Sequence, residues 1–97
     1  NCGRYLVSLS RGGIVNELEL FNCLNNQKLT CAGLDVFETE PVLKNKLLNC
    51  DNFIGTPHIA ASTIEAQIRV GLESANQIIS SLNGERPKNL INKEILD

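Results

Sequence analysis

The chain has 97 residues, of which 42% are hydrophobic and 21% are charged, and its formal net charge is −2. This length suits one domain with a modest core, and the charge balance gives no electrostatic basis for binding nucleic acid or an anionic membrane surface. The longest apolar runs are too short to span a bilayer and no secretory signal is visible. We therefore expect a cytoplasmic protein with neither nucleic acid nor membrane among its partners.

The chain begins with Asn1 and contains no methionine. We therefore expect it to be a piece of a longer protein. Its four cysteines, Cys2, Cys23, Cys31 and Cys50, form no C-x-x-C pair, and no zinc-ligand spacing occurs. Reduced, half-buried thiols are the expectation, with neither a disulfide framework nor a metal site.

The first part of the chain predicts a strand, a helix and a second strand. The apolar run Tyr5–Leu9 is closed by two glycines, which is typical of a buried strand ending in a tight turn. Asn16 is placed to cap a helix, with Glu19 as its reciprocal partner, and the asparagines at 25–26 end that helix. The apolar run Leu29–Phe37 then predicts a second strand.

The remainder predicts a third strand and a long helix. Residues 42–50 suit one or two helical turns, and residues 52–59 form a third strand candidate. The helix over 62–83 begins at Ser62, carries apolar residues at three- and four-residue steps, and ends at an Asn-Gly pair. The end of the tail, residues 89–97, suits a short strand or a loop.

Alternation of strands and helices indicates an α/β fold with a parallel sheet and helical crossovers. The strands read as continuous apolar runs, which is expected when helices cover both faces of the sheet. In such a fold, ligands bind outside the carboxyl ends of the strands. Arg11 and Glu40 follow the first and second predicted strands and His58 lies at the end of the third, so we expect all three to line one cleft at this edge.

These three side chains have complementary chemistry. A carboxylate beside an imidazole favours the protonated imidazole, and a guanidinium binds a carboxylate with a planar fork of donors. The set would suit proton transfer on a small acid anion. The spacing alone leaves open a structural alternative, in which Arg11 and Glu40 form a surface ion pair and His58 is unrelated.

Three segments, "SRGGIVNE", "AGLDVFETEP" and "TPHIAAST", together resemble the signature segments of the D-isomer-specific 2-hydroxyacid dehydrogenases. The resemblance covers nearly the whole chain in the right order. It implies a partial, second-half Rossmann-like NAD-binding domain. Residues 1–61 would supply its strand–helix–strand–strand portion and 62–83 its long helix. Residues 84–97 would return toward a substrate domain.

The resemblance also implies residue roles. Arg11 corresponds to the arginine that binds the substrate carboxylate, Glu40 to the glutamate that pairs with the histidine, and His58 to the general acid/base. Asp35 corresponds to a residue near the nicotinamide carboxamide. The positions that would line the cofactor are Leu9, Ser10, Arg11, Asp35, His58, Ala60 and Ala61. Alanines stand at 60 and 61 where the family often has glycine.

No G-x-G-x-x-G occurs among the seven glycines, so the turn that would bind the NAD pyrophosphate is absent from these 97 residues. In the family that turn lies upstream. Alone, the chain should bind NAD poorly and show no turnover, and its truncated sheet should expose an unpaired edge. The rest of the parent chain is therefore an expected partner, and the full-length protein is expected to be a homodimer.

The continuation "STIEAQ" is most similar to the branch of the family that oxidises 3-phosphoglycerate to 3-phosphohydroxypyruvate in serine biosynthesis. Reduction of glyoxylate or hydroxypyruvate is the alternative within the enzymes. A different class also stays open, a non-catalytic NAD-sensing module similar to transcriptional corepressors. A dehydrogenase assay of the full-length protein would separate the two classes.

Overall fold

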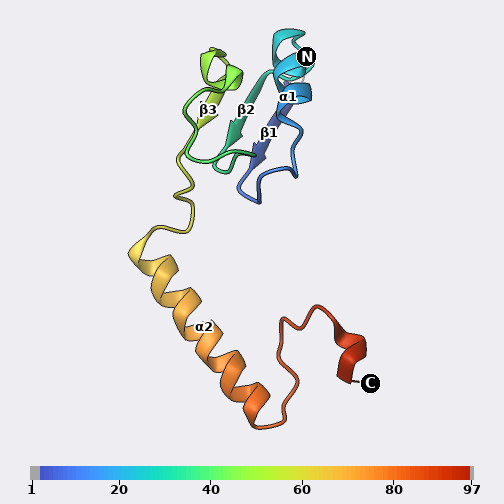
Figure 1. Ribbon diagram of the computed structural model, residues 1–97, viewed down its shortest axis with the longest axis vertical. Helices are drawn as coiled ribbons and strands as arrows, with labels where there is room; N and C mark the ends of the chain where they lie inside the picture. The colour runs from blue at the N-terminus through green and yellow to red at the C-terminus, as the bar shows by residue number, and fades with distance from the viewer. Residues whose placement is uncertain (1–2, 97) are drawn as a thin grey trace. The chain divides into compact units, whose positions relative to one another are not determined.

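A computed structural model describes residues 3–96, and the chain divides after Ala60 into two compact units. The first unit holds a parallel three-stranded sheet in the order β1 (Tyr5–Ser8), β2 (Cys31–Leu34) and β3 (Phe53–Gly55) (Figure 1). The predicted α/β class with parallel strands is therefore confirmed. The strands are shorter than the apolar runs that predicted them.

The first crossover is the helix α1 (Glu17–Asn25), which connects β1 to β2. It begins as predicted, because the side-chain oxygen of Asn16 accepts a hydrogen bond from the Glu19 backbone N–H at 3.0 Å. This bond satisfies one of the backbone donors that every helix start leaves without a partner. The helix ends at the predicted asparagines, with Asn26 as its C-cap.

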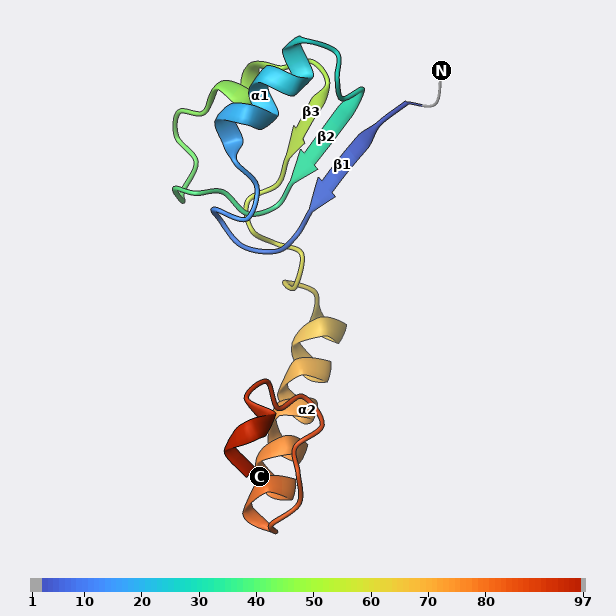
Figure 2. The same cartoon turned by 90° about the vertical axis from the view of Figure 1, so that its right-hand side faces the viewer.

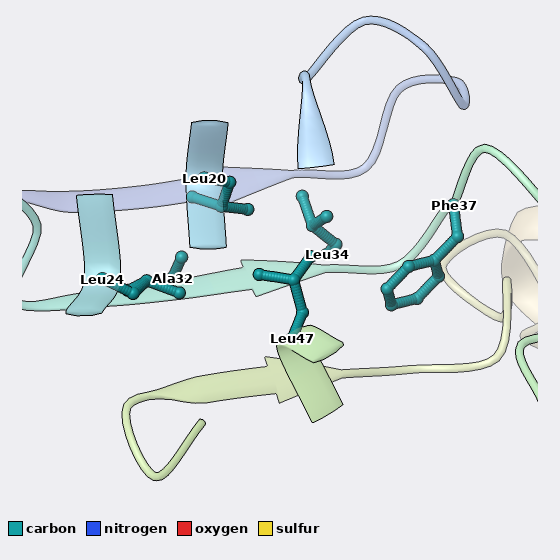
Figure 3. Packing of buried hydrophobic residues seen from close by; sticks show 6 residues of the cluster. All are labelled: Leu20, Leu24, Ala32, Leu34, Phe37 and Leu47. Atoms are coloured by element: carbon teal, nitrogen blue, oxygen red, sulfur yellow. The ribbon is translucent and has the colours of Figure 1, made fainter. Parts of the chain in front are cut away.

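The second crossover, between β2 and β3, contains the short 3₁₀ helix η1 (Lys46–Asn49). Figure 2 shows α1 lying over one face of the sheet, and η1 packs against both α1 and β3. The buried core lies between these elements (Figure 3), and it consists of Leu20, Leu24, Ala32, Leu34, Phe37 and Leu47. Full burial of an aliphatic side chain of this size stabilises a fold by about 1.5–3 kcal/mol.

The opposite face of the sheet has no helix from residues 3–60 on it. Tyr5, Val7 and Ile54 project from that face with 70%, 75% and 64% of their surface exposed. The prediction that helices cover both faces is therefore wrong for this unit. Alternate side chains of a strand point to opposite faces, so α1 and η1 can bury only one half of each apolar run.

The second unit contains the long helix α2 (Ile64–Leu82). Its N-cap is Thr63, whose hydroxyl accepts from the Ala66 backbone N–H at 3.1 Å, so the predicted cap at Ser62 is wrong by one residue. At the other end, Gly84 has a φ of +80°. The N–H groups of Gly84 and Glu85 donate to the carbonyls of Ser81 and Ser80 at 3.1 and 2.9 Å. These two backbone hydrogen bonds form a Schellman motif.

The tail is irregular over residues 89–92, as predicted, and differs from the prediction only after them. Residues Lys93–Leu96 form a 3₁₀ turn, η2, rather than a strand or an irregular loop. Within the described residues, no helix combines the length and the apolar character needed to cross a membrane. Cys23, Cys31 and Cys50 are free and half-buried as expected, and Cys2 lies outside the described residues.

Candidate active site

Three loops leave the carboxyl ends of the strands, and each carries one residue of the predicted catalytic set. Arg11 follows β1, Glu40 follows β2 and His58 follows β3. The parallel sheet brings these loops to one edge, as Figure 2 shows where the chain leaves the arrowheads. This is the edge at which ligands bind in open α/β sheets.

The Glu40 and His58 side chains contact each other directly. Oε2 of Glu40 lies 2.8 Å from Nδ1 of His58, and Oε1 of Glu40 accepts the Phe37 backbone N–H at 2.9 Å. The Phe37 N–H and, after it, the His58 imidazole hold the pKa of Glu40 below its usual value. The predicted proximity of Glu40 and His58 is therefore confirmed, and the carboxylate stays ionised near neutral pH.

This contact orients the imidazole. An ionised carboxylate only accepts hydrogen bonds, so the Nδ1–H of His58 donates to Glu40. Nε2 is then the ring nitrogen available to exchange a proton with a bound molecule. The His58 side chain is 48% exposed, so a ligand can reach it from solvent. The geometry suits general acid–base catalysis.

The Asp35 carboxylate fixes the loop that carries His58. The residue is 1% exposed. Its Oδ1 accepts from the Thr56 hydroxyl at 2.6 Å and from the Ile59 N–H at 2.9 Å, while its Oδ2 accepts from the Ala60 N–H at 3.0 Å. These donors, with Thr56 first, lower the pKa of Asp35. Bonds on both sides of His58 hold this short segment against the end of β2.

His58 itself has an uncommon backbone conformation, with a φ of +55°. Its backbone N–H donates to the Asp35 carbonyl at 2.9 Å. A non-glycine residue in such a region costs about 1–3 kcal/mol and persists only where the surroundings impose it. The bonds from Asp35 are the surroundings that do so, and they direct the imidazole toward Glu40.

Arg11 lies in the first loop, and its guanidinium donates to the neighbouring Ser10 carbonyl at 2.9 Å. The adjacent Gly12 approaches the second loop so closely that a Cβ on it would lie 2.3 Å from the Phe37 carbonyl oxygen. The first two loops therefore pack together through backbone. Only a residue without a side chain allows this approach.

A pocket of about 540 Å³ opens beside the carboxylate–imidazole pair. It combines three polar side chains with a mostly apolar wall, and it is lined by Phe37, Glu40, Pro41, Val42, Leu48, Gly55, Thr56, Pro57 and His58. Arg11 is not among these residues. The structure therefore brings Glu40 and His58 to one cavity, while the expectation that Arg11 shares a cleft with them stays a prediction.

The residues predicted to line a cofactor fall into separate groups. Leu9 and Ser10 are exposed at the end of β1, and the hydroxyls of Ser8 and Ser10 lie 2.9 Å apart. The Ala60 N–H is used by the Asp35 carboxylate. Ala61 belongs to the second unit, where its carbonyl accepts from the Gln67 side chain. The cofactor roles of these residues stay predictions.

Sequence reasoning missed two residues that hold the site. Thr56 donates the shortest hydrogen bond to Asp35. Glu17 accepts hydrogen bonds from the loop that carries Glu40. Thr56 directly precedes Pro57, and the Thr56 hydroxyl is the only local feature of the sequence that could have indicated this hydrogen bond. In the sequence, Glu17 indicates only a favourable charge at a helix start. Its partner Glu38 lies 21 residues away, so no local pattern predicts their contact.

Open parallel α/β sheets bind nucleotide cofactors outside the carboxyl ends of their strands, and the glutamate–histidine pair lies at this edge. Residues 2–60 match the family described as "D-isomer specific 2-hydroxyacid dehydrogenase, NAD binding domain". The match covers more than half of the chain. The chain belongs to this family, and the resemblance inferred from its three sequence segments is confirmed.

Individual relatives carry different substrate names. The chain is 47% identical over 87 residues to the D-3-phosphoglycerate dehydrogenase of Methanocaldococcus jannaschii. The aligned region covers 90% of this chain and 17% of that protein. It is 46% identical over 83 residues to the hydroxypyruvate reductase of Thermotoga maritima. This aligned region covers 82% of this chain and 27% of that protein. The chain thus spans roughly a sixth to a quarter of these relatives.

A solved structure shares the fold of this chain. The PH0520 protein of Pyrococcus horikoshii superimposes on 95% of this chain with a TM-score of 0.84 and 38% identity, and the match covers 28% of that protein.

Proposed function

We propose that this chain is the nicotinamide-side part of an NAD-dependent dehydrogenase of D-2-hydroxy acids. The observation that carries the proposal is the 2.8 Å contact between Glu40 Oε2 and His58 Nδ1 at the carboxyl edge of the sheet. The contact occupies Nδ1 of the half-exposed His58 imidazole and leaves Nε2 available to a bound molecule. Family membership supports the same reading.

In the oxidation direction, Nε2 of His58 accepts the proton of the substrate hydroxyl, and Glu40 stabilises the imidazolium that results. NAD would supply the acceptor for the hydride on the carbon that bears this hydroxyl group. Within the described residues, the guanidinium of Arg11 donates one hydrogen bond, to the Ser10 carbonyl. Its other N–H groups suit a substrate carboxylate. In the reduction direction, protonated His58 returns the proton to the carbonyl oxygen.

The residues present fit one half of the cofactor. An exposed apolar Leu9 and an exposed Ser10 hydroxyl stand at the end of β1, and such a pair suits the ring and the amide of nicotinamide. The chain holds no glycine-rich turn for the pyrophosphate. The adenosine and pyrophosphate contacts therefore belong to other parts of the intact protein.

We propose 3-phosphoglycerate as the substrate, with glyoxylate or hydroxypyruvate as the rival. The name of the Methanocaldococcus jannaschii relative supports the first and that of the Thermotoga maritima relative supports the second. Steady-state assays of the intact protein with these acids, in both directions and with NAD(H), rank them by kcat/KM. A higher kcat/KM for glyoxylate or hydroxypyruvate than for the phosphorylated pair would reject the first choice.

The test of the chemistry is His58→Ala in the intact protein. We expect kcat to fall by about 10²–10⁴-fold, the usual contribution of a general acid–base group, while the Kd for NADH changes little. His58→Gln, which retains a polar side chain of similar length, controls for a simple loss of packing. Binding of NADH by a wild-type protein that turns over none of the acids would instead favour a non-catalytic NAD-sensing module.

A further inference from the structure

The first residue of α1, Glu17, is half-buried and contacts a loop that lies far from it in sequence. Its Oε1 accepts the Glu38 backbone N–H at 2.7 Å, and its Oε2 accepts from Nδ2 of the Asn45 side chain at 2.6 Å. Both bonds are charge-assisted, and such bonds are about twice as strong as neutral ones. Glu17 thus connects α1 to the segment between β2 and β3.

The two contacts lie on either side of Glu40. Residues 38–45 contain neither helix nor strand, so no backbone ladder fixes their path. The Asn45 side chain also caps η1, because its Oδ1 accepts the Leu47 N–H at 3.0 Å. Glu17 therefore anchors one end of the loop through Glu38 and the other end through the cap of η1.

A simpler role for Glu17 is a favourable charge at the positive end of the α1 dipole. Glu19 lies in the same first turn and shares that role, but it is exposed. The recorded bonds to the Glu40 loop come from Glu17. The two glutamates therefore differ in their contacts with this loop.

We propose that Glu17 is a positioning residue for Glu40. By holding Glu38 and Asn45, it determines where the loop presents the Glu40 carboxylate to His58. The inference rests on the proposed function, in which the Glu40–His58 contact stabilises the protonated imidazole. A displacement of about 1 Å at a catalytic group can reduce turnover by about 10²-fold.

The first experiment compares Glu17→Ala with Glu19→Ala in the intact protein. We expect Glu17→Ala to lower kcat/KM for reduction by about 10- to 100-fold and to move the pH profile in the same direction as loss of the Glu40 charge. Glu19→Ala is expected to stay within about threefold of wild type at every pH. Glu17→Gln keeps an oxygen for the Glu38 N–H and should recover part of the loss.

Asn45→Asp provides an independent variant in case Glu17→Ala does not fold. It keeps the oxygen that caps η1 but replaces the donor to Glu17 with a second carboxylate. We expect it to change the pH profile as Glu17→Ala does. Identical pH profiles for wild type, Asn45→Asp and Glu17→Gln, with an intact fold, would overturn the proposal.

Amide hydrogen exchange of residues 38–45 in the intact protein separates this inference from the proposed function. We expect faster exchange across that segment in Glu17→Ala than in Glu19→Ala, whether or not the protein turns over a 2-hydroxy acid. Equal exchange in the two variants would show that Glu17 does not hold the loop. A wild-type protein without dehydrogenase activity would instead reject the proposed function alone.

Discussion

Asp35 and Glu40 are two carboxylates of the same connection, and they act on different parts of His58. Asp35 is buried and bonds the backbone on both sides of the histidine. Glu40 is partly exposed and bonds the ring itself. One carboxylate therefore sets the position of the histidine, and the other sets the orientation and charge of its ring.

Replacement of Glu40 by glutamine tests the second role in the intact protein. Glutamine keeps the shape but removes the charge that stabilises the imidazolium. Reduction requires protonated His58, so the limb of kcat/KM that falls with rising pH should move to lower pH in Glu40→Gln. The matched control is Glu38→Gln, at an exposed position two residues away. Superimposable profiles for Glu40→Gln and wild type would mean that the pair is only structural.

Replacement of Asp35 by asparagine tests the first role through acid stability. The pKa of Asp35 is lower in the folded chain than its usual value of 3.8 because Thr56 and two backbone N–H groups donate to the carboxylate. Its contribution to stability is therefore complete above about pH 4 and is lost as the pH falls through the lowered value. Wild type should exceed Asp35→Asn in unfolding free energy at pH 7.

The difference between the two proteins should shrink as the pH falls from 4 toward 2. Urea unfolding of the chain at a series of pH values measures this difference in unfolding free energy. Asp51→Asn, at an exposed turn, is the control. A gap between wild type and Asp35→Asn that is constant from pH 7 to pH 2 would contradict the linkage.

The sequence was sufficient to place Arg11, Glu40 and His58 at one edge of a sheet, because the ends of parallel strands meet there. It was insufficient for Glu17 and Thr56. Their contacts with Glu38 and Asp35 join residues 21 positions apart, and no local periodicity encodes such pairs.

At the scale of elements, local signals decided where helices begin and end. Asn16 was found as the cap of α1 because one suitable residue precedes the helix. The start of α2 offered both Ser62 and Thr63, and the hydroxyl of Thr63 reaches the N–H three residues on. The turn at Lys93–Leu96 was not predicted, although Asn92, a residue type common at helix starts, directly precedes it.

The two glycines of the α2 region should respond to alanine in opposite directions. Gly84 has a φ of +80°, where a Cβ costs about 1–2 kcal/mol, so Gly84→Ala should destabilise α2. Gly71 lies inside the helix with no atom within 4 Å of an added Cβ. Gly71→Ala should stabilise the helix by about 0.5–1 kcal/mol. Thermal unfolding followed by far-ultraviolet circular dichroism of the chain measures both, and equal shifts would contradict the helix-end assignment.

For the whole molecule, the chain carries the proton-transfer residues without the turn for the cofactor pyrophosphate. The 97-residue chain alone should therefore bind NAD weakly, with a Kd well above the micromolar range, and show no turnover. Isothermal titration calorimetry with NAD tests this, and the intact protein serves as the positive control. Micromolar binding by the chain alone would mean that its three loops hold the cofactor without the glycine-rich turn.

Within the first unit, the apolar sheet face opposite α1 and the edges of the sheet predict self-association of the isolated chain. Tyr5, Val7 and Ile54 are apolar and exposed, and β1 and β3 are both edge strands. Exposed edges and apolar faces favour pairing between chains. Light scattering over a range of concentrations should show oligomers, and Val7→Lys should reduce them. A monodisperse monomer at high concentration would exclude the association.

Gly12 has a consequence for how this molecule can change over generations. An added Cβ there would lie 2.3 Å from the Phe37 carbonyl oxygen, and this obstacle is main chain, which no substitution at 37 removes. Every nucleotide change that alters the amino acid at position 12 therefore meets the same collision. A lineage that keeps the first two loops packed in this way cannot drift at that codon beyond the synonymous glycine triplets.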